Sequence, residues 1–382
     1  MTHRERVVTA LNHQEPDRVP MDLSGTLVTG ITRIAYRNLL KHLGDDREEL
    51  PVFDPIQQLA TVHEDILQRF EVDFRNVPNQ PPSTWQPDYH DENGYHCFTD
   101  QWGIGWRMPR DRGLYYDMYK HPLAGATLDG LARYQWPDPL DPGRREGLAA
   151  QAQALFASTD CAIVHGWGFG AGFLEQCVWA QGFEDGLANL VADEQLTHRF
   201  LETVMERNIQ YADVVLDEIG PYIHIWGFGD DLGHQDSPMF GVAMFRTYLK
   251  DRYTRFFAAI KRKAPHVKVF FHTCGSVYDF VPDLIETGID ILNPVQVSAA
   301  RMDPGRLKRE FGDALAFWGG IDTHHVLPHG TPQQVRDEVR RRIEELAPGG
   351  GYVLNSVHNI QADVPPANVV AMFEAGLEYG GY

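Results

Sequence analysis

Residues 315–357 read LAFWGGIDTHHVLPHGTPQQVRDEVRRRIEELAPGGGYVLNSV. The stretch opens and closes with short apolar runs of strand character, 315–320 and 351–357. Between them, Thr331 and Pro332 stand at the capping and first positions of a helix, which is expected to end before Pro348 and the glycines beside it. A strand, a helix and a second strand in this order are typical of a parallel βα unit.

The same alternation runs along most of the chain. Two further helices are readable, one over 236–264 with Asp236 or Ser237 as its N-cap, and one over 365–381 after the last strand. Eight parallel strands close a barrel, so we predict a single (β/α)8 TIM-barrel domain spanning residues 1–382. The eight candidate strands are 19–23, 72–77, 161–166, 222–228, 267–272, 290–295, 315–320 and 351–357.

Residues 79–140 interrupt this alternation between the second and third strands. They hold four of the eight tryptophans, and Asn93-Gly94 is a strong signal for a tight hairpin turn. We therefore expect an inserted antiparallel β-hairpin near residues 79–125. Such an insertion lies either over the catalytic face of the barrel or in a contact between two copies of the chain, and both placements remain open.

Composition excludes several classes of function. Apolar residues make up 43% of the chain, enough for a large core, and 34 Lys and Arg against 53 Asp and Glu give a formal net charge of −19. Phosphate backbones and anionic lipids repel such a chain, so we expect neither a nucleic-acid partner nor a membrane partner. The four cysteines do not suggest a disulfide framework, and no signal peptide or membrane span is readable, so we expect a cytoplasmic protein.

The strongest indication of chemistry is VKVFFHTCGS at 267–276. Side chains alternate along a strand, so His272 and Cys274 point to the same side at the C-terminal end of the strand, where barrel enzymes carry their catalytic groups. His358 stands directly after the last strand. Two histidines and one cysteine are good Zn²⁺ ligands, and three protein ligands leave one position open, as in catalytic sites. The two strands are the fifth and the eighth, so they share a metal only if their ends lean over the barrel axis.

Two other interpretations of the pair remain open. His272 and Cys274 could be a hydrogen-bonded histidine and a buried cysteine that packs as a small apolar residue. Alternatively, Cys274 could act as a thiolate nucleophile beside His272. The nucleophile is disfavoured because two side chains at i and i+2 of one strand project in parallel rather than towards each other.

Polar residues follow other strands as well. Asp231 and Gln235 lie in the loop after the fourth strand, where a carboxylate can complete a metal shell or orient a substrate, or where the loop can simply lead into the next helix. Glu175 stands in the first turn of the helix after a Gly-rich loop, and Asp322 follows the seventh strand. We take Asp231 and Glu175 as candidate catalytic residues, and Gln235 and Asp322 as candidate substrate-binding residues.

Several motifs together resemble the uroporphyrinogen decarboxylase superfamily. They are RERVVTALNHQEPDRVP near the N-terminus, DDLGHQDSPMF, FHTCGSVYDFVPDLIETGIDILNPVQ, FWGGIDT and GGGYVLNSVHNIQADVPPANV. The resemblance covers nearly the whole chain and implies a (β/α)8 barrel. In the decarboxylases of this superfamily an aspartate binds the pyrrole N–H groups and arginines hold the propionates. Their RQAGRY-type signature has no counterpart here, because MDLSGT follows RVP instead.

A second branch of the superfamily, the zinc-dependent methyltransferases that work with a corrinoid protein, is more similar. Its zinc motif is His-x-Cys followed by a distant Cys after the last strand. His272 and Cys274 match the first part, and His358 stands where the last Cys is expected. The resemblance implies Zn²⁺ bound by these three residues. It also implies methyl transfer between a small substrate of methoxy, methylamine or thiol type and a corrinoid (cobalamin) on a partner protein, and a possible homodimer.

Asp54 and Gln57, in VFDPIQQ at 52–58, complete the candidate substrate-binding residues. Asp54 could take the pyrrole-binding place of a decarboxylase, although the residues around it match that family poorly. A metal-free tetrapyrrole decarboxylase and a non-catalytic corrinoid or tetrapyrrole binder therefore remain the two alternatives to a methyltransferase.

Overall fold

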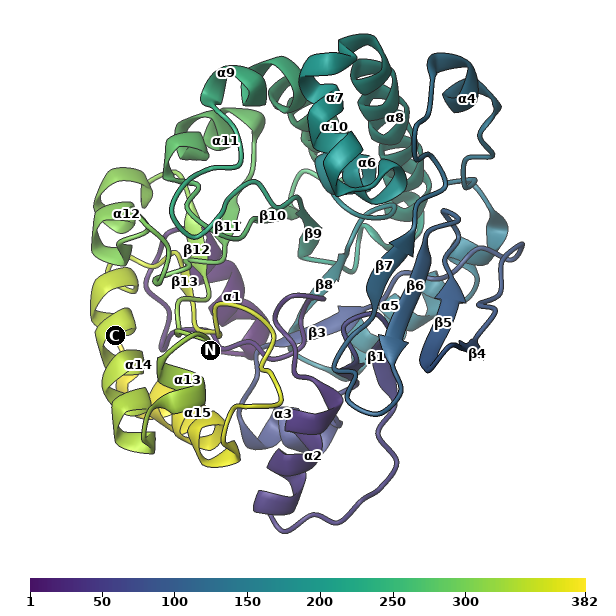
Figure 1. The fold of residues 1–382 in the computed structure, drawn as a ribbon. Helices are drawn as coiled ribbons and strands as arrows, with labels where there is room; N and C mark the ends of the chain where they lie inside the picture. The colour runs from purple at the N-terminus through teal and green to yellow at the C-terminus, as the bar shows by residue number, and fades with distance from the viewer.

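The computed structural model describes all residues, 1–382, and its centre is a seven-stranded parallel sheet (Figure 1). Neighbouring strands follow one another along the chain, as successive βα units require. The sheet contains, in spatial order, β3 (Phe74–Val77), β8 (Ala162–Gly166), β9 (Ile225–Gly229), β10 (Lys268–His272), β11 (Ile291–Asn293), β12 (Ala316–Trp318) and β13 (Tyr352–Val353).

Residues 19–23, the expected first strand, close the sheet into a barrel without forming a regular strand. On one side, Asp22 N donates to Leu354 O at 3.0 Å, just after β13. On the other side, Asp73 N donates to Met21 O at 2.9 Å, just before β3. The expected strand is reduced to one parallel bridge between Met21 and Leu354, yet it occupies the eighth position. The (β/α)8 prediction is therefore confirmed.

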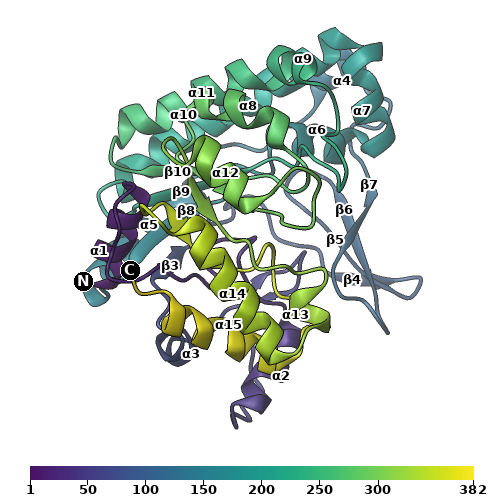
Figure 2. The same cartoon turned by 90° about the vertical axis from the view of Figure 1, so that its left-hand side faces the viewer.

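Helices surround the barrel on its outer side (Figures 1 and 2). The predicted cap at Thr331 is present, because its Oγ1 accepts the N–H of Gln334 at 3.3 Å. No helix of the chain combines the length and apolar character that crossing a membrane requires. The helices are α1 (His3–Leu11), α2 (Arg33–His42), α3 (Glu64–Arg69), α4 (Leu128–Arg133), α5 (Leu148–Ser158), α6 (Phe173–Gln181), α7 (Phe183–Ala192), α8 (Glu194–Ile219), α9 (Val242–Phe245), α10 (Asp251–Lys263), α11 (Val281–Thr287), α12 (Pro304–Phe311), α13 (Val326–His329), α14 (Pro332–Leu346) and α15 (Pro366–Tyr379).

The helix expected over 236–264 begins later than predicted. Gly241 is the N-cap of α9, so neither Asp236 nor Ser237 caps a helix, and a π-helical turn joins α9 to α10. The residues before Gly241 form a loop instead. This loop is fixed by its neighbour in space, because His234 O accepts the N–H of Ser276 beyond β10 at 2.8 Å. A contact between residues so far apart in the chain overrides the local helical pattern.

The insertion between β3 and β8 is larger than the single hairpin expected. It is a four-stranded antiparallel sheet whose strands follow one another in chain order. Asn93 and Gly94 form the predicted tight turn, with φ values of 48° and 83°. A separate two-stranded hairpin, β1 (Val52–Asp54) and β2 (Leu59–Ala60), was not predicted. The insertion contains β4 (His90–Glu92), β5 (Tyr95–Thr99), β6 (Gly105–Pro109) and β7 (Asp117–Lys120).

Apolar side chains fill the inside of the barrel, and α1 closes one end of it. Phe270 and Trp318 from the strands pack in one interior cluster with Val7 and Leu11 of α1, while a larger apolar layer lies between the strands and the outer helices. Both termini lie at the α1 end, and the insertion lies on the opposite side of the molecule (Figure 2). The accessible end of the barrel is therefore the one where the strands end.

Candidate metal centre

β10 carries two of the predicted ligands to this accessible end. Phe270 faces the barrel interior, so His272, two residues further along the strand, faces the same way. The strand ends at His272, and Gly275 turns the chain with a φ of 86° directly after Cys274. His272 is 3% exposed, and its Nε2 lies 3.4 Å from Cys274 Sγ. The two side chains are thus held next to each other.

Gly229, the last residue of β9, leaves the space that His272 occupies. A Cβ at this position would lie 2.6 Å from the Trp167 ring and 2.8 Å from the Cβ of His272. The rings of Trp167 and His272 pack with their centroids 5.7 Å apart. A side chain at position 229 would therefore displace one of the two rings.

His358 joins this pair from the other side of the barrel mouth. In the sheet, β11 and β12 lie between β10 and β13, yet ligand atoms of His358, His272 and Cys274 all lie within 4.8 Å of one another. The rings of the two histidines meet edge to face with centroids 5.5 Å apart. Asn359 holds the loop, because its amide donates to Gln57 Oε1 at 2.8 Å. The strand ends do lean over the barrel axis, and we call these three residues the donor cluster.

Asn293, the last residue of β11, sets the tautomer of His272. Its Oδ1 lies 2.5 Å from His272 Nδ1, and its Nδ2 donates to Trp318 O at 2.9 Å. Because the amide nitrogen is engaged by a carbonyl, the amide oxygen faces the ring and the imidazole proton sits on Nδ1. The lone pair of Nε2 is then free for a metal. Sequence reasoning missed Asn293, although a polar residue that ends a buried strand is a usable signal.

Both candidate catalytic carboxylates border the donor cluster. Asp231 Oδ1 accepts the N–H of Cys274 at 2.8 Å and lies 3.7 Å from His272 Nε2. Burial, together with the charges of Asp231 and Asp230, raises the pKa of Glu175 well above its usual value. Asp230 has a different role, because its Oδ1 accepts the N–H of Glu175 at 2.9 Å in the first turn of α6. The loop after β9 thus contacts the donor cluster through Asp231 and holds the first turn of α6 through Asp230.

The donor cluster fits a divalent cation that prefers nitrogen and sulfur ligands. Burial lowers the pKa of His272 and lowers that of His358 to about 4, so both imidazoles are neutral at pH 7. Burial, together with the charge of Asp231, raises the pKa of Cys274 well above its usual range. A bound cation would reverse this effect and stabilise the thiolate. Two imidazoles, one thiolate and a neighbouring carboxylate match the ligands of Zn²⁺.

One expectation about the His-x-Cys pair was wrong. Strand alternation predicted parallel side chains without mutual contact, but Cys274 Sγ and His272 Nε2 are 3.4 Å apart. The reason is that β10 ends at His272, so Cys274 no longer follows the strand geometry. The contact alone would allow a nucleophilic thiol. The raised pKa of Cys274 still disfavours a thiolate without a cation beside it.

A pocket of about 490 Å³, which we call the mouth pocket, opens beside the donor cluster. His272, His358, Asp231 and Glu175 line one side of it. The insertion lines another side and therefore covers the barrel end at which the strands end, which is one of the two placements expected. We call the insertion's lining residues the insertion wall: Asn79, Trp85, Phe98, Asp100, Gln101, Trp102, Trp106 and Met118.

Two of the four predicted substrate-binding residues line the mouth pocket. Asp54 ends β1 and Gln57 lies in the turn that follows, where Asp54 Oδ1 accepts the N–H of Gln57 at 2.7 Å. The other two lie outside the lining. Gln235 is exposed and hydrogen-bonded to the loop after β11, and Asp322 accepts the N–H of His324 at 2.7 Å before α13. These two side chains shape loops, because the segments after β9 and β12 fold away from the pocket.

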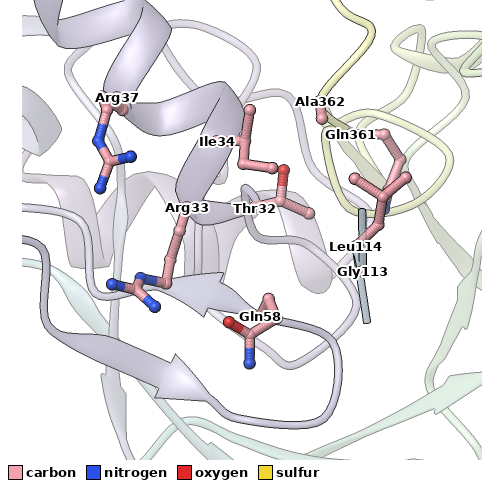
Figure 3. A pocket seen from close by; sticks show the side chains of 9 residues that line it. All are labelled: Thr32, Arg33, Ile34, Arg37, Gln58, Gly113, Leu114, Gln361 and Ala362. Atoms are coloured by element: carbon pink, nitrogen blue, oxygen red, sulfur yellow. The ribbon is translucent and has the colours of Figure 1, made fainter. Parts of the chain in front are cut away.

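A second pocket, of about 180 Å³, lies at the start of α2 and shares no lining residue with the mouth pocket (Figure 3). Arg33 and Arg37 extend from α2 to the same side, and Leu114 and Gln361 lie on the other side of Thr32. The two pockets differ in charge, because none of the 23 residues that line the mouth pocket is Lys or Arg. Basic side chains therefore face the outer pocket and not the candidate metal centre.

Comparison with known proteins gives the chain a family. A family model described as uroporphyrinogen decarboxylase (URO-D) matches residues 172–379, more than half of the chain and the part that carries the donor cluster. The chain belongs to the uroporphyrinogen decarboxylase family. A uroporphyrinogen decarboxylase of Alkalilimnicola ehrlichii is 26% identical over 289 residues, 72% of each chain. That of Pseudoalteromonas translucida is 38% identical over 72 residues, 19% of this chain and 20% of the relative.

A solved structure, a methyltransferase from Methanosarcina mazei, is similar over 99% of both chains, with a TM-score of 0.68 and 16% sequence identity. At this identity the similarity shows a shared fold. Together with the family match, it confirms the superfamily resemblance that the motifs indicated. The chain is thus a member of the uroporphyrinogen decarboxylase family with a His-Cys-His cluster, a possible metal site, at the mouth of its barrel.

Proposed function

We propose that this chain is a zinc-dependent methyltransferase, which exchanges a methyl group between a small methylated substrate and a corrinoid on a partner protein. The observation that carries the proposal is the donor cluster. His272, Cys274 and His358 converge to within 4.8 Å of one another beside the mouth pocket. Three protein ligands leave one position for an atom of the substrate, as catalytic zinc sites require.

The residues around the donor cluster would each have a different role in the reaction. Zn²⁺, when bound, would act as a Lewis acid on the oxygen, nitrogen or sulfur atom that carries the methyl group. Asn293 keeps Nε2 of His272 free for the metal. Asp231 borders the open position and can complete the shell before substrate binds. Glu175 lines the same pocket, and its burial favours the protonated form, so it is placed to give a proton to the departing atom.

The corrinoid would arrive on its partner at the barrel mouth. The corrinoid would supply the acceptor for the methyl group: the bond between the methyl carbon and the heteroatom would break, and the electron pair would stay on the heteroatom. The net charge of −19 favours a partner with a basic docking face. The possible homodimer also stays a prediction.

A metal-free tetrapyrrole decarboxylase is the second candidate, and the description of the matching family model favours it. Its substrate carries several carboxylates, which need cationic partners in the pocket. The lining of the mouth pocket offers no Lys or Arg and instead places Asp54 in the wall. A non-catalytic binder is the third candidate. The presence of all three donors, with Asn293 orienting His272, argues against it.

Metal analysis of the purified protein tests the proposal. Without chelators, we expect about one equivalent of zinc in the wild type and less than about a tenth in His272→Ala. His324→Ala is the matched control, because this exposed histidine lies outside the cluster, and it should keep its zinc. Less than about half an equivalent in the wild type, unchanged in His272→Ala, would overturn the methyltransferase. Turnover of uroporphyrinogen by the metal-free protein would establish the decarboxylase instead.

A further inference from the structure

The lining of the mouth pocket combines aromatic rings with negative charge. Of its 23 residues, six are aromatic, four are carboxylic acids and none is Lys or Arg. Five of the six aromatic residues are tryptophans, whose ring faces attract cations more strongly than those of Tyr or Phe. A pocket with this lining repels anions and favours compact cations.

Trp106 shows how the rings of this lining are held in place. It meets Trp179 of α6 edge to face at 5.4 Å between centroids, and it stacks on Phe98 at 6.5 Å with an interplanar angle of 14°. Its indole N–H donates to Asp100 Oδ2 at 2.9 Å, which fixes the plane of the ring. Rings held in this way need little reordering when a ligand enters, so the free-energy cost of binding is small.

Two of the carboxylates belong to elements that do not carry the donor cluster. Asp54 lies in the β1–β2 hairpin and Asp100 in the insertion, and burial raises the pKa of each to about 6, so both are ionised at pH 7. Apart from burial, only hydrogen bonds from N–H groups affect these two pKa values, and they lower them. No basic side chain contributes. Arg144 donates to Gln101 from behind the wall, but its guanidinium stacks on Phe169 at 4.5 Å and does not line the pocket.

We propose that the mouth pocket recognises a methylated ammonium group, so that the substrate is a small methylated organic cation such as a quaternary amine. The methyl groups of such a cation spread its positive charge over a surface that packs against tryptophan faces. Asp54 and Asp100 neutralise this charge from outside the donor cluster. The nitrogen of a quaternary amine has no lone pair, so Zn²⁺ would not bind it in the intact cation and would act on it only as the C–N bond breaks and the electron pair stays on nitrogen. The transfer of the methyl group rests on the function proposed above, whereas recognition of the cation rests on the pocket lining alone.

The test compares two ligands that differ only in charge. Choline and 3,3-dimethylbutan-1-ol have the same shape, with nitrogen replaced by carbon in the neutral compound. Isothermal titration of the full-length, zinc-saturated protein should show choline binding about tenfold more tightly. Equal affinities, or tighter binding of the neutral alcohol, would overturn the inference, because the lining would then act only as an apolar surface.

Two variants test which residues of the mouth pocket bind the cation. Trp85→Leu removes a ring from the insertion wall, and Asp54→Asn removes one charge while keeping the oxygen that accepts the N–H of Gln57. Each should weaken choline binding about five- to tenfold and leave the neutral alcohol within about twofold. The matched controls are Tyr115→Leu and Asp111→Asn, exposed residues of the insertion outside the pocket, which should change neither affinity.

The same samples separate failure of this inference from failure of the proposed function. Selective choline binding by a protein that holds no zinc would leave the cation site in place and remove the methyltransferase. Full zinc occupancy and methyl transfer from a neutral methyl ether, without preference for choline, would keep the methyltransferase and overturn the cation site. The comparison of the two ligands in the wild type does not depend on whether a variant folds.

Discussion

The two sides of the mouth pocket are built differently. The donor cluster comes from the ends of barrel strands, where Asn293, Gly229 and the loop around Asn359 hold ligand atoms at short distances. The insertion wall comes from an added antiparallel sheet, in which aromatic packing and hydrogen bonds to Asp100 hold rings in place. The difference suggests that the barrel supplies the reacting centre, while the added sheet shapes what can reach it.

Cys274→Ser should have the largest effect on the donor cluster. A serine hydroxyl is a poor ligand for Zn²⁺, so we expect zinc content to fall below about a tenth of an equivalent and methyl transfer to fall at least about a hundredfold. Choline affinity should stay within about threefold if the two sides act separately. Mass spectrometry of the metal and titration of choline measure both. A parallel loss of choline binding would contradict the separation, and Cys97→Ser, in the insertion, is the control.

Asn293 tests whether the cluster depends on the orientation of His272. Asn293→Ala removes the acceptor for His272 Nδ1, and zinc affinity should fall about 10- to 100-fold in competition with a chelator. Asn293→Asp restores an acceptor and should recover most of that loss. Equal losses in both variants would show that the residue acts only through packing around Trp318.

Asp100 tests the insertion wall in the same way. Its carboxylate accepts the N–H groups of Trp102 and Ile104 at 2.8 and 2.9 Å as well as the indole N–H of Trp106. Asp100→Ala should lower the free energy of unfolding by about 2–3 kcal/mol and weaken choline binding, while zinc content stays unchanged. Thermal unfolding with parallel metal analysis measures this. Loss of zinc in this variant would show that the wall also supports the cluster.

The smallest effect is expected inside the barrel, away from both sides of the pocket. Burial raises the pKa of Asp22 to about 7, although Gly25 N and the Trp318 indole N–H donate to its carboxylate. Between about pH 4 and pH 7 the unfolded chain loses this proton and the folded chain keeps it, so this residue destabilises the fold increasingly as pH rises. Asp22→Asn should therefore stabilise the protein by about 1–2 kcal/mol at pH 8 and by less at pH 5.

Melting temperatures of Asp22→Asn and wild type across this pH range give the measurement. The exposed Asp160→Asn is the control and should show no such trend. A constant difference between Asp22→Asn and wild type at all pH values would mean that the carboxyl does not titrate on unfolding.

The fold was largely predictable because parallel strands of a barrel are buried on both faces. Short apolar runs therefore stood out, and each of the seven regular strands lies at a predicted run or within a residue of it. The predictions were wrong where contacts between residues far apart in the sequence determine the local structure. The bond between His234 and Ser276 delays the start of α9, and pairing of four short strands enlarges the insertion beyond the hairpin that Asn93 and Gly94 indicated.

The candidate site was predictable only in part. Strand alternation and ligand chemistry identified His272 and Cys274, the position directly after the last strand indicated His358, and the resemblance to a family supported all three. Asn293 was missed, because its role depends on lying beside His272 in the neighbouring strand. Gln235 and Asp322 were proposed for the pocket because they follow strands, but the loops that carry them fold away from it.

The sequence by itself determined the barrel, through the spacing of its apolar runs, and the kinds of ligand atom available, through residue chemistry. Only the tertiary structure decided that ligands from two non-adjacent strands meet, because the distance between strand ends depends on how far each leans over the axis. It also decided which charges face the pocket. The mouth pocket is free of Lys and Arg while Arg33 and Arg37 lie at an outer pocket, a segregation produced by packing, since neighbours in space and not in sequence line each cavity.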